Sequence, residues 1–233
     1  IQLLLLGAGF LTARLFGFRR RFASLYPCAF AFGFMAIPLF STVFGLEHMG
    51  TLTSMGVGHE LFIGLVFMPL ARLYLKGEGA TPRQIGKNLL SPLFLMIFLA
   101  LVLQLSGLRD QVVATDLGGG IIDTIGQLGG ISSTLILLTV GYRIRLDNPA
   151  KLRESVRLVV WRYLLIFVIS YAVKALLMDP MAGGDPFFDA AFFTLISQHG
   201  SVILNAYIAQ YGSREDSEIA SNAFAVNAVA GIA

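Results

Sequence analysis

Residues 197–205 read SQHGSVILN, at the centre of the apolar stretch 187–211. A membrane-spanning helix takes roughly 20 apolar residues, and a polar, glycine-containing segment in its middle predicts an interruption. Freed amides and half-helix N-termini suit an anion, whereas freed carbonyls suit a cation. The segment therefore predicts a binding site, with a kinked packing contact as the alternative. Its candidate substrate-binding residues are Gln198, His199, Gly200, Ser201 and Asn205.

The composition around this segment is that of a membrane protein. Hydrophobic residues make up 56% of the 233 residues and charged residues 13%, against about 25% charged in soluble chains. The mean hydropathy of +0.75 excludes an ordinary water-soluble globule. The net charge of +3 comes from short basic clusters between apolar runs, which is typical of membrane topology and not of nucleic-acid binding. The single cysteine, Cys28, excludes an internal disulfide and any multi-cysteine metal site, and no cofactor is expected.

Eight apolar stretches are separated by basic or turn-rich breaks. They are continuously apolar and do not alternate with period two, so we expect helices and not outer-membrane strands. The first and last look too short to span, which predicts a chain truncated at both ends. The stretches cover approximately 1–13, 27–45, 52–75, 89–108, 120–141, 158–178, 187–211 and 217–233.

The loops between these stretches alternate between basic and non-basic. Four basic loops hold 15 of the 17 Lys and Arg residues. The positive-inside rule places these loops, which include Arg14, Arg20 and Arg162, in the cytoplasm. We therefore expect a multi-pass protein of a plasma membrane or a bacterial inner membrane.

An offset of 167 residues aligns the chain with itself. FSTVFG (40–45) falls on YIAQYG (207–212), Gly33 on Gly200, and Ser54 on Ser221. Five helices separate the two copies, so they would have opposite orientations, as in the inverted repeats of secondary transporters. Three regions are predicted. Residues 1–76 are the remainder of a first repeat, and we expect two further helices of that repeat to precede the chain. Residues 77–88 are a cytoplasmic linker, and residues 89–233 are a second five-helix repeat.

The first copy has its own interrupted helix. In FAFGFMAIP (30–38), Gly33 and Pro38 stand five residues apart, and proline removes a helical hydrogen bond. We expect Gly33 and Pro38 to shape a second break that faces residues 198–205.

Ionisable residues inside the apolar stretches are candidates for coupling an ion or a proton. His199 lies near mid-membrane, and His59 and Glu60 lie about eight residues into their helix. The alternatives are a neutral His199 bonded to a carbonyl, and a Glu60 that reaches the outer water. Asp123 and Asp189 are expected to be helix caps.

No enzyme motif is present in full, and we expect that the protein is not an enzyme. His59-Glu60 begins the zinc-protease pattern H-E-x-x-H, but Ile63 stands in place of the second histidine. An intramembrane hydrolase that uses Ser197 or Ser201 with His199 is a distant alternative.

These residues resemble the auxin efflux carrier family of PIN-like transporters. Gly33 to Pro38 with Gly45 is similar to the family's fourth helix, Lys87-Asn88 with Ser91-Pro92 to its sixth, and Leu135 to Gly141 to its seventh. Asn205 to Gly212, with Ser221 beyond, is similar to its ninth and tenth. The resemblance covers nearly the whole chain, and it rests on the order and spacing of short motifs.

The resemblance implies an all-α transporter of ten helices in two inverted repeats, whose broken fourth and ninth helices cross at the substrate site. It implies a secondary transporter of small organic anions, a homodimer and no nucleic-acid partner. The related bile-acid symporters use sodium, and a sodium-coupled anion symporter is the alternative function. Na⁺ or H⁺ would then be the coupling ion.

The chain departs from the family at the breaks. Ala31 stands where the fourth helix usually has Asn, residues 199–201 stand in place of a Pro in the ninth, and residues 132–134 replace the Pro of the seventh. The resemblance therefore supports the architecture more firmly than the substrate or the coupling ion.

Overall fold

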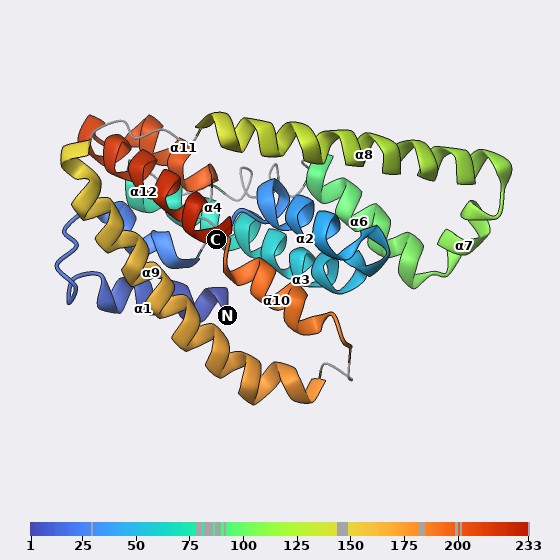
Figure 1. Ribbon diagram of the computed structural model, residues 1–233, viewed down its shortest axis with the longest axis horizontal. Coiled ribbons are helices and arrows are strands. Elements are labelled where there is room, and N and C mark those ends of the chain that lie inside the picture. The colour runs from blue at the N-terminus through green and yellow to red at the C-terminus, as the bar shows by residue number, and fades with distance from the viewer. Residues whose placement is uncertain are drawn as a thin grey trace.

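The protein is a helical assembly in the computed structural model, which describes residues 1–28, 30–77, 81, 86, 90, 92–143, 149–181, 185–198, 200 and 202–232. Within these ranges there is no strand, apart from one isolated bridge between Phe30 and Gly200, so the helical prediction is confirmed. In Figure 1, the long α8 (Asp116–Arg143) runs along one edge above α6 (Pro92–Leu105) and α7 (Leu108–Val113). The remaining helices occupy the middle of the view and the opposite end.

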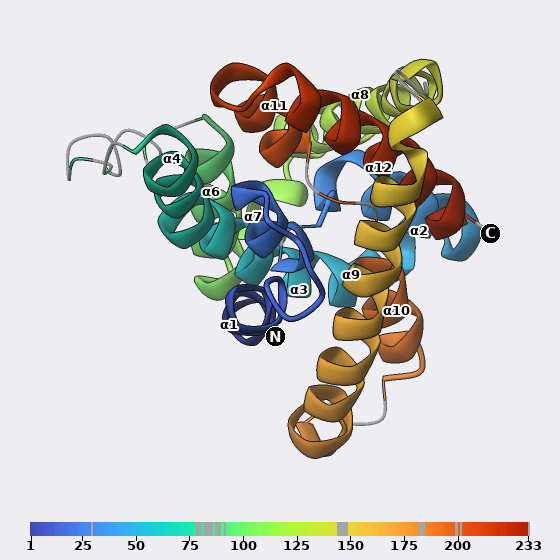
Figure 2. The ribbon, with the colours of Figure 1, turned by 90° about the vertical axis from the view of Figure 1, so that its left-hand side faces the viewer.

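One group of elements packs around a shared apolar core. Trp161, Phe22, Phe67 and Phe192 are among its buried members. In Figure 2, α12 runs beside the first part of α9, and the two helices pack against each other there. The elements of this group are α1 (Gln2–Thr12), the 3₁₀ segment η1 (Arg21–Cys28), the end of α3 (Met49–Phe62), the π-helical turn η4 (Ile63–Phe67), α4 (Met68–Lys76), α9 (Leu152–Val173), α10 (Phe188–Ile196), α11 (Val202–Tyr211) and α12 (Arg214–Ile232).

A smaller cluster of buried residues forms a second core. Phe32, Phe40, Leu52 and Ala191 meet there. They come from the π-helical turn η2 (Phe32–Ala36), α2 (Ile37–Phe44), α3 (Met49–Phe62) and α10. The short 3₁₀ segments η3 (Leu46–His48), η5 (Pro149–Lys151) and η7 (Asp179–Met181) connect neighbouring helices.

Three π-helical turns each end two residues before a proline. Proline has no N–H for the bond to the fourth preceding carbonyl, and its ring crowds that carbonyl. A wider turn with one extra residue relieves both problems while the helix continues. The three turns are η2 before Pro38, η4 (Ile63–Phe67) before Pro69 and η6 (Lys174–Met178) before Pro180.

Among the described residues, two continuous helices are long and apolar enough to cross a membrane. They are Met49–Lys76, which joins α3, η4 and α4, and Leu152–Met178, which joins α9 and η6. The other elements follow the predicted apolar stretches within a few residues. However, the stretch 187–211 forms two short helices, α10 and α11, and 27–45 combines a 3₁₀ segment with helix, so neither is one continuous span.

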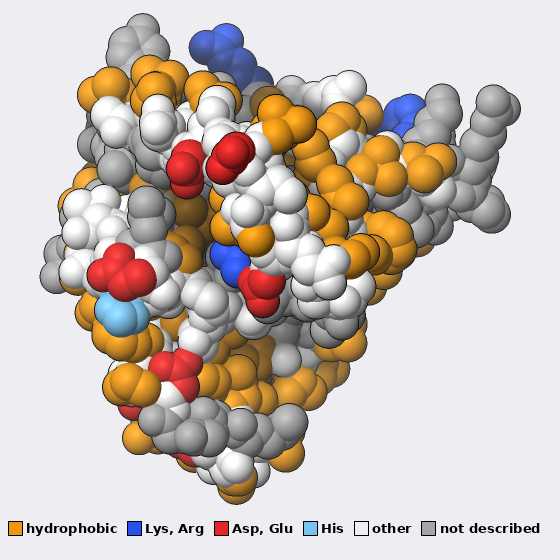
Figure 3. Space-filling view, turned by 90° about the vertical axis from the view of Figure 1, so that its right-hand side faces the viewer, with side chains coloured by type: hydrophobic (Ala, Val, Ile, Leu, Met, Phe, Trp, Pro, Cys, Tyr) orange, Lys and Arg blue, Asp and Glu red, His pale blue; other side chains and the backbone are white. Residues whose placement is uncertain are grey.

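The outer surface is largely apolar, whereas several polar side chains are buried. Leu117, Ile121, Leu128 and Leu135 lie exposed along α8, and Val160, Leu164 and Val168 along α9. Figure 3 shows hydrophobic side chains across much of one face, with few charged side chains among them. Inside, Ser155, Arg162, Ser170, Asn222 and Asn227 have no exposed surface. Monomeric soluble proteins seldom expose apolar patches of this extent.

Candidate functional site

The two interrupted segments meet at one point. Phe30, in the extended backbone between η1 and η2, forms an antiparallel bridge with Gly200, which lies between α10 and α11. Phe30 is buried, with 3% of its surface exposed. Non-helical backbone from two separate parts of the chain therefore lies together in the interior.

Glycine at position 200 allows this close approach. A Cβ atom on Gly200 would lie 3.1 Å from Cε2 of the buried Tyr26 ring. This contact is tighter than most Cβ contacts, so a side chain at position 200 would require the Tyr26 ring to shift.

Asn227 of α12 ties the crossing to α9. In the amide orientation that satisfies all of its neighbours, its oxygen accepts hydrogen bonds from Arg162 Nη1 at 3.1 Å and from the Gly200 N–H at 3.0 Å. Its nitrogen donates to the Tyr163 hydroxyl at 2.7 Å. That hydroxyl donates in turn to the Ser197 carbonyl at 3.1 Å. One amide thus connects Ser197 and Gly200, which lie between α10 and α11, to α9.

Arg162 is fully buried beside the crossing. Its guanidinium carbon lies 5.4 Å from the centre of the Phe30 ring, 5.6 Å from that of Tyr163 and 5.9 Å from that of Tyr26. Within the described part of the chain, no carboxylate pairs with it, and its Nε and Nη2 atoms have no hydrogen-bond partner. The aromatic faces stabilise its charge, but the described residues leave one edge of its donors without a hydrogen-bond partner.

Gln198 is also buried in the break, with 1% of its surface exposed. Its Nε2 donates to the Thr194 carbonyl of α10, and its Oε1 has no hydrogen-bond partner among the described residues. Ser197 Oγ donates to the same carbonyl at 3.3 Å, so this hydroxyl is used within its own helix. His199 and Ser201, predicted from the sequence as site residues, lie outside the described residues.

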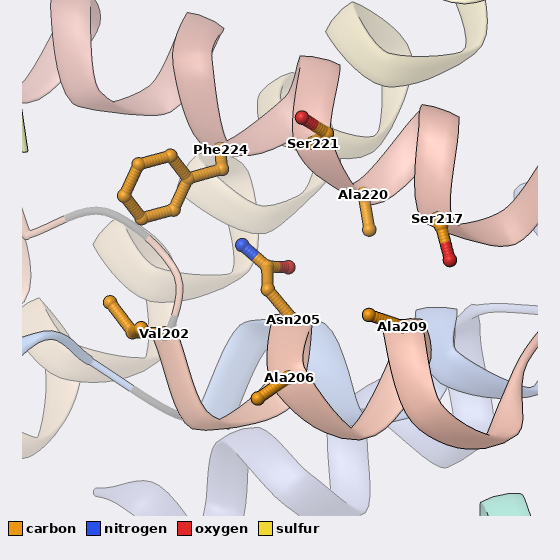
Figure 4. A pocket seen from close by; sticks show the side chains of 8 residues that line it. All are labelled: Val202, Asn205, Ala206, Ala209, Ser217, Ala220, Ser221 and Phe224. Atoms are coloured by element: carbon orange, nitrogen blue, oxygen red, sulfur yellow. The ribbon is translucent and has the colours of Figure 1, made fainter. Parts of the chain in front are cut away.

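Asn205 faces a cavity between α11 and α12. The cavity has a volume of about 330 Å³. Figure 4 shows the Asn205 amide pointing from α11 toward α12, with Val202 and Phe224 at one end of the cavity. Asn205 Oδ1 is buried, without a hydrogen-bond partner among the described residues. The lining also includes Ala206, Ala209, Ser217, Ala220 and Ser221.

The structure places Gly33 and Pro38 close to the first break but not at the bridge. Gly33 lies in the π-helical turn η2 with an exposed surface, and Pro38 is buried in the first turn of α2. The interruption includes Phe30 and Ala31, which lie three and two residues before Gly33. The π-helical turn absorbs the effect of Pro38 without breaking the helix, so the predicted position of the break was too far along the chain.

His59 lines a second, more apolar cavity of about 460 Å³. Its Nδ1 lies 2.6 Å from Gln2 Nε2, and its ring lies between those of Phe30 and Phe32, with centroids 6.0 and 5.9 Å away. Glu60, the next residue on α3, is partly buried and does not line this cavity. In the described ranges, no three His, Cys, Asp or Glu side chains are grouped as metal ligands.

Three of the predicted cytoplasmic loops meet at Arg20. Its guanidinium contacts Glu154 at 3.0 Å, Glu215 at 3.0 Å and Asp216 at 2.7 Å, and Lys151 also contacts Glu215. Hydrogen bonds from Lys151 and Arg20 lower the pKa of Glu215. Burial raises the pKa of Asp216, but hydrogen bonds, first from Arg20 and then from Ser213, outweigh it, so its pKa is lowered.

Two of the predicted non-basic loops meet at a separate contact. Thr51 donates a hydrogen bond to Asp185, and the His48 ring stacks on Phe187 with centroids 3.7 Å apart. That hydrogen bond, together with one from the Phe187 N–H, lowers the pKa of the Asp185 carboxyl. Basic loops therefore contact basic loops, and non-basic loops contact non-basic loops.

Sequence reasoning missed Arg162 and Asn227. Arg162 was counted with a basic cytoplasmic loop, although it lies four residues inside the stretch 158–178. Asn227 lies ten residues inside the last apolar stretch. A polar side chain at such a depth is a signal of function, but only the packing of α9 against α12 and the break brings these two residues together.

Comparison with known proteins finds no relative: no family model, no curated protein and no solved structure matches the chain.

Proposed function

We propose that the protein is a multi-pass secondary transporter of the auxin-efflux-carrier type, which moves a small organic anion with a carboxylate group by alternating access. The observation that carries the proposal is the antiparallel bridge between Phe30 and Gly200. Irregular backbone in the interior of a membrane protein is tolerated where it is covered by protein or lines a cavity, and transporters place their substrates at such points.

The order of the elements supports an inverted repeat. Adding 167 to the bounds of η1 gives 188–195, which lies within α10. The same shift takes α2 to 204–211, within α11, and takes the start of α3 to 216, two residues into α12. The interruption between η1 and η2 and the one between α10 and α11 thus occupy equivalent places in two halves of the chain.

The loop contacts support the predicted topology. Arg20, Glu154 and Asp216 come from three loops that the positive-inside rule assigns to one side, and Thr51 and Asp185 come from two loops assigned to the other. A wrong number of crossings between these loops would have brought loops of opposite type together.

Substrate would be held at the crossing and in the adjoining cavity. Gln198 Oε1 and Asn205 Oδ1 are buried polar atoms without partners among the described residues, and such atoms are costly unless they bind something. His199 and Ser201 stay proposed contacts on the sequence alone. His59 and Glu60 stay the candidates for a coupling proton or ion.

The test is a thermal-shift titration of the purified protein with acetate, benzoate and malonate, each in sodium or potassium and at two pH values. A ligand that binds only the folded state raises the apparent stability by mass action. We expect a shift with at least one carboxylate and none with its uncharged amide. The variants Gln198→Ala and Asn205→Ala should weaken this shift, whereas Ser54→Ala, an exposed position on α3, should not.

The outcomes separate the alternatives. A shift that requires sodium indicates the bile-acid type of symporter, whereas a pH-dependent shift without sodium indicates proton coupling. No shift with any carboxylate contradicts the anion-transporter proposal. Covalent labelling by a serine-directed fluorophosphonate would instead favour the hydrolase.

A further inference from the structure

We infer that Arg162 is the residue that recognises the carboxylate group of the substrate, with Asn227 as the residue that positions it. This inference rests on the proposed function, and it adds a buried cation that the sequence alone assigned to a loop. The observation is an arginine with no exposed surface, beside the crossing of the two breaks, with one edge of donors that no described residue pairs with.

The identity of the unpaired atoms points to the ligand. A guanidinium group is planar, and its Nε–H and one N–H of Nη2 point the same way from one edge. This edge matches the two oxygens of a carboxylate, which it binds through two parallel hydrogen bonds. In Arg162 these two nitrogens have no partner in the described part of the chain, whereas Nη1 is used by Asn227.

The neighbours of Arg162 stabilise the rest of the group but leave this edge unsatisfied. The rings of Phe30, Tyr163 and Tyr26 contact its charge at 5.4–5.9 Å. Ring contacts attract the cation, but they do not accept hydrogen bonds in the guanidinium plane. A buried charge without a counter-charge is costly, and an anion with two acceptor oxygens removes that cost.

Arg162 lies beside the crossing, and the crossing adjoins the Asn205 cavity, although Arg162 itself does not line that cavity. The Asn227 oxygen accepts from both Arg162 Nη1 and the Gly200 N–H. Val202 and Phe224, at one end of the cavity, lie two residues after Gly200 and three residues before Asn227. A carboxylate on Arg162 would therefore lie where the break, α9 and α12 meet, with the rest of a small substrate directed toward Asn205.

The full protein would be tested with acetate, benzoate and malonate and with the corresponding amides, by thermal shift and by equilibrium dialysis of the radiolabelled acids. We expect Arg162→Lys, which keeps the charge and loses the planar edge, to weaken carboxylate binding by about 10-fold or more, because a bidentate pair is lost. Arg162→Gln should abolish binding. Arg214→Gln is the matched control, since the side chain of Arg214 is 94% exposed, and it should bind as the wild type does.

A second variant keeps the inference testable if Arg162→Gln does not fold. Asn227→Asp places a carboxylate beside Arg162 Nη1 without changing the size of the side chain. We expect its unliganded form to melt at a higher temperature than the wild type, and we expect added carboxylate to cause little or no further shift, because the internal anion competes for the same cation.

The outcomes distinguish the two proposals. If the wild type binds none of the acids, the proposed function fails, and this inference fails with it. If the wild type binds an acid and folded Arg162→Lys and Asn227→Asp bind it equally well, only the role of Arg162 is overturned. Loss of binding in both variants, with binding retained by Arg214→Gln, supports the inference.

Discussion

The Phe32 ring fills the space in which residue 56 would carry a side chain: a Cβ atom on Gly56 would lie 1.9 Å from Phe32 Cζ. This contact fixes the π-helical turn η2 against α3. It therefore sets the position of the helix that follows the first break.

Substitution of Gly56 should destabilise the fold. Gly56→Ala forces the Phe32 ring to move, and overpacking of this kind costs about 1–3 kcal/mol. Gly58→Ala is the matched control on the same helix, because a Cβ there meets nothing within 4 Å. It should be neutral or stabilising by up to about 1 kcal/mol, since alanine favours helix. Thermal unfolding in detergent measures the stability of both variants. Equal melting temperatures for Gly56→Ala and Gly58→Ala would contradict the described packing.

Substitution of Gly200 should impair ligand binding more than folding. Gly200→Val directs its side chain into the Tyr26 ring and separates the two segments that meet at the bridge. We expect about a 10-fold or greater loss of carboxylate affinity. Gly33→Ala is the control, because a Cβ on Gly33 meets nothing within 4 Å. Equilibrium dialysis measures the carboxylate dissociation constant of each variant. An unchanged dissociation constant for Gly200→Val would argue against a site at the crossing.

Acidification should weaken the cluster around Arg20. The pKa values of Glu215 and Asp216 are lowered in the folded protein from ordinary values of 4.5 and 3.8. Lowered carboxyl pKa values stabilise the fold at pH values above the ordinary ones, and this stabilisation is lost as the pH falls through the lowered values. The wild type should therefore lose stability as the pH falls below about 4.5. Arg20→Gln should be less stable at pH 7 and should show a shallower loss.

Melting temperatures measured from pH 7 to pH 3 test this prediction. Arg109→Gln is a suitable control, because among the described residues Arg109 forms an ion pair only with the adjacent Asp110, at 3.5 Å, and its side chain is 55% exposed. Parallel curves for the wild type and Arg20→Gln would show that the cluster contributes no pH dependence.

Loops that contact each other should lie on the same side of the membrane. In a Cys28→Ala background, single cysteines at Arg214 or Arg14 should react with a membrane-impermeant maleimide only from the cytoplasmic side. Cysteines at Glu47 or Asp110, whose side chains are 71% and 86% exposed, should react only from the opposite side. Intact cells and inverted vesicles provide the two orientations. Labelling of all four positions from one side would contradict the proposed topology.

Hydrophobicity predicts where the helices lie, but not how they are divided. The apolar stretch 158–178 corresponds to α9 with η6, and 52–75 to the continuous helix Met49–Lys76. The interruption near Gly200 was predictable, because polar residues and glycine concentrate there. The first break was placed at residues 33–38 because Gly and Pro are the visible helix breakers, yet Phe30 and Ala31, which form it, carry no such signal.

The interior of the site depends on packing, which a sequence pattern does not give. Arg162 is near the boundary of an apolar stretch, so its charge alone favours a loop. Its burial depends on Tyr26, Phe30 and Asn227, which come from other elements of the chain. Asn205 was predicted from its position within the break segment, and the structure places it on a cavity.

The π-helical turn η4 gives one helix two separate faces. An extra residue in a helical turn rotates everything beyond it by about 100° relative to an uninterrupted helix. Before the turn, α3 packs against α2 and α10; after it, α4 packs against η1 and α11. The continuous helix Met49–Lys76 thus packs into both the smaller core and the larger one. Deletion of one residue within Ile63–Phe67 would bring the two faces out of phase with their cores while leaving the composition of the helix almost unchanged.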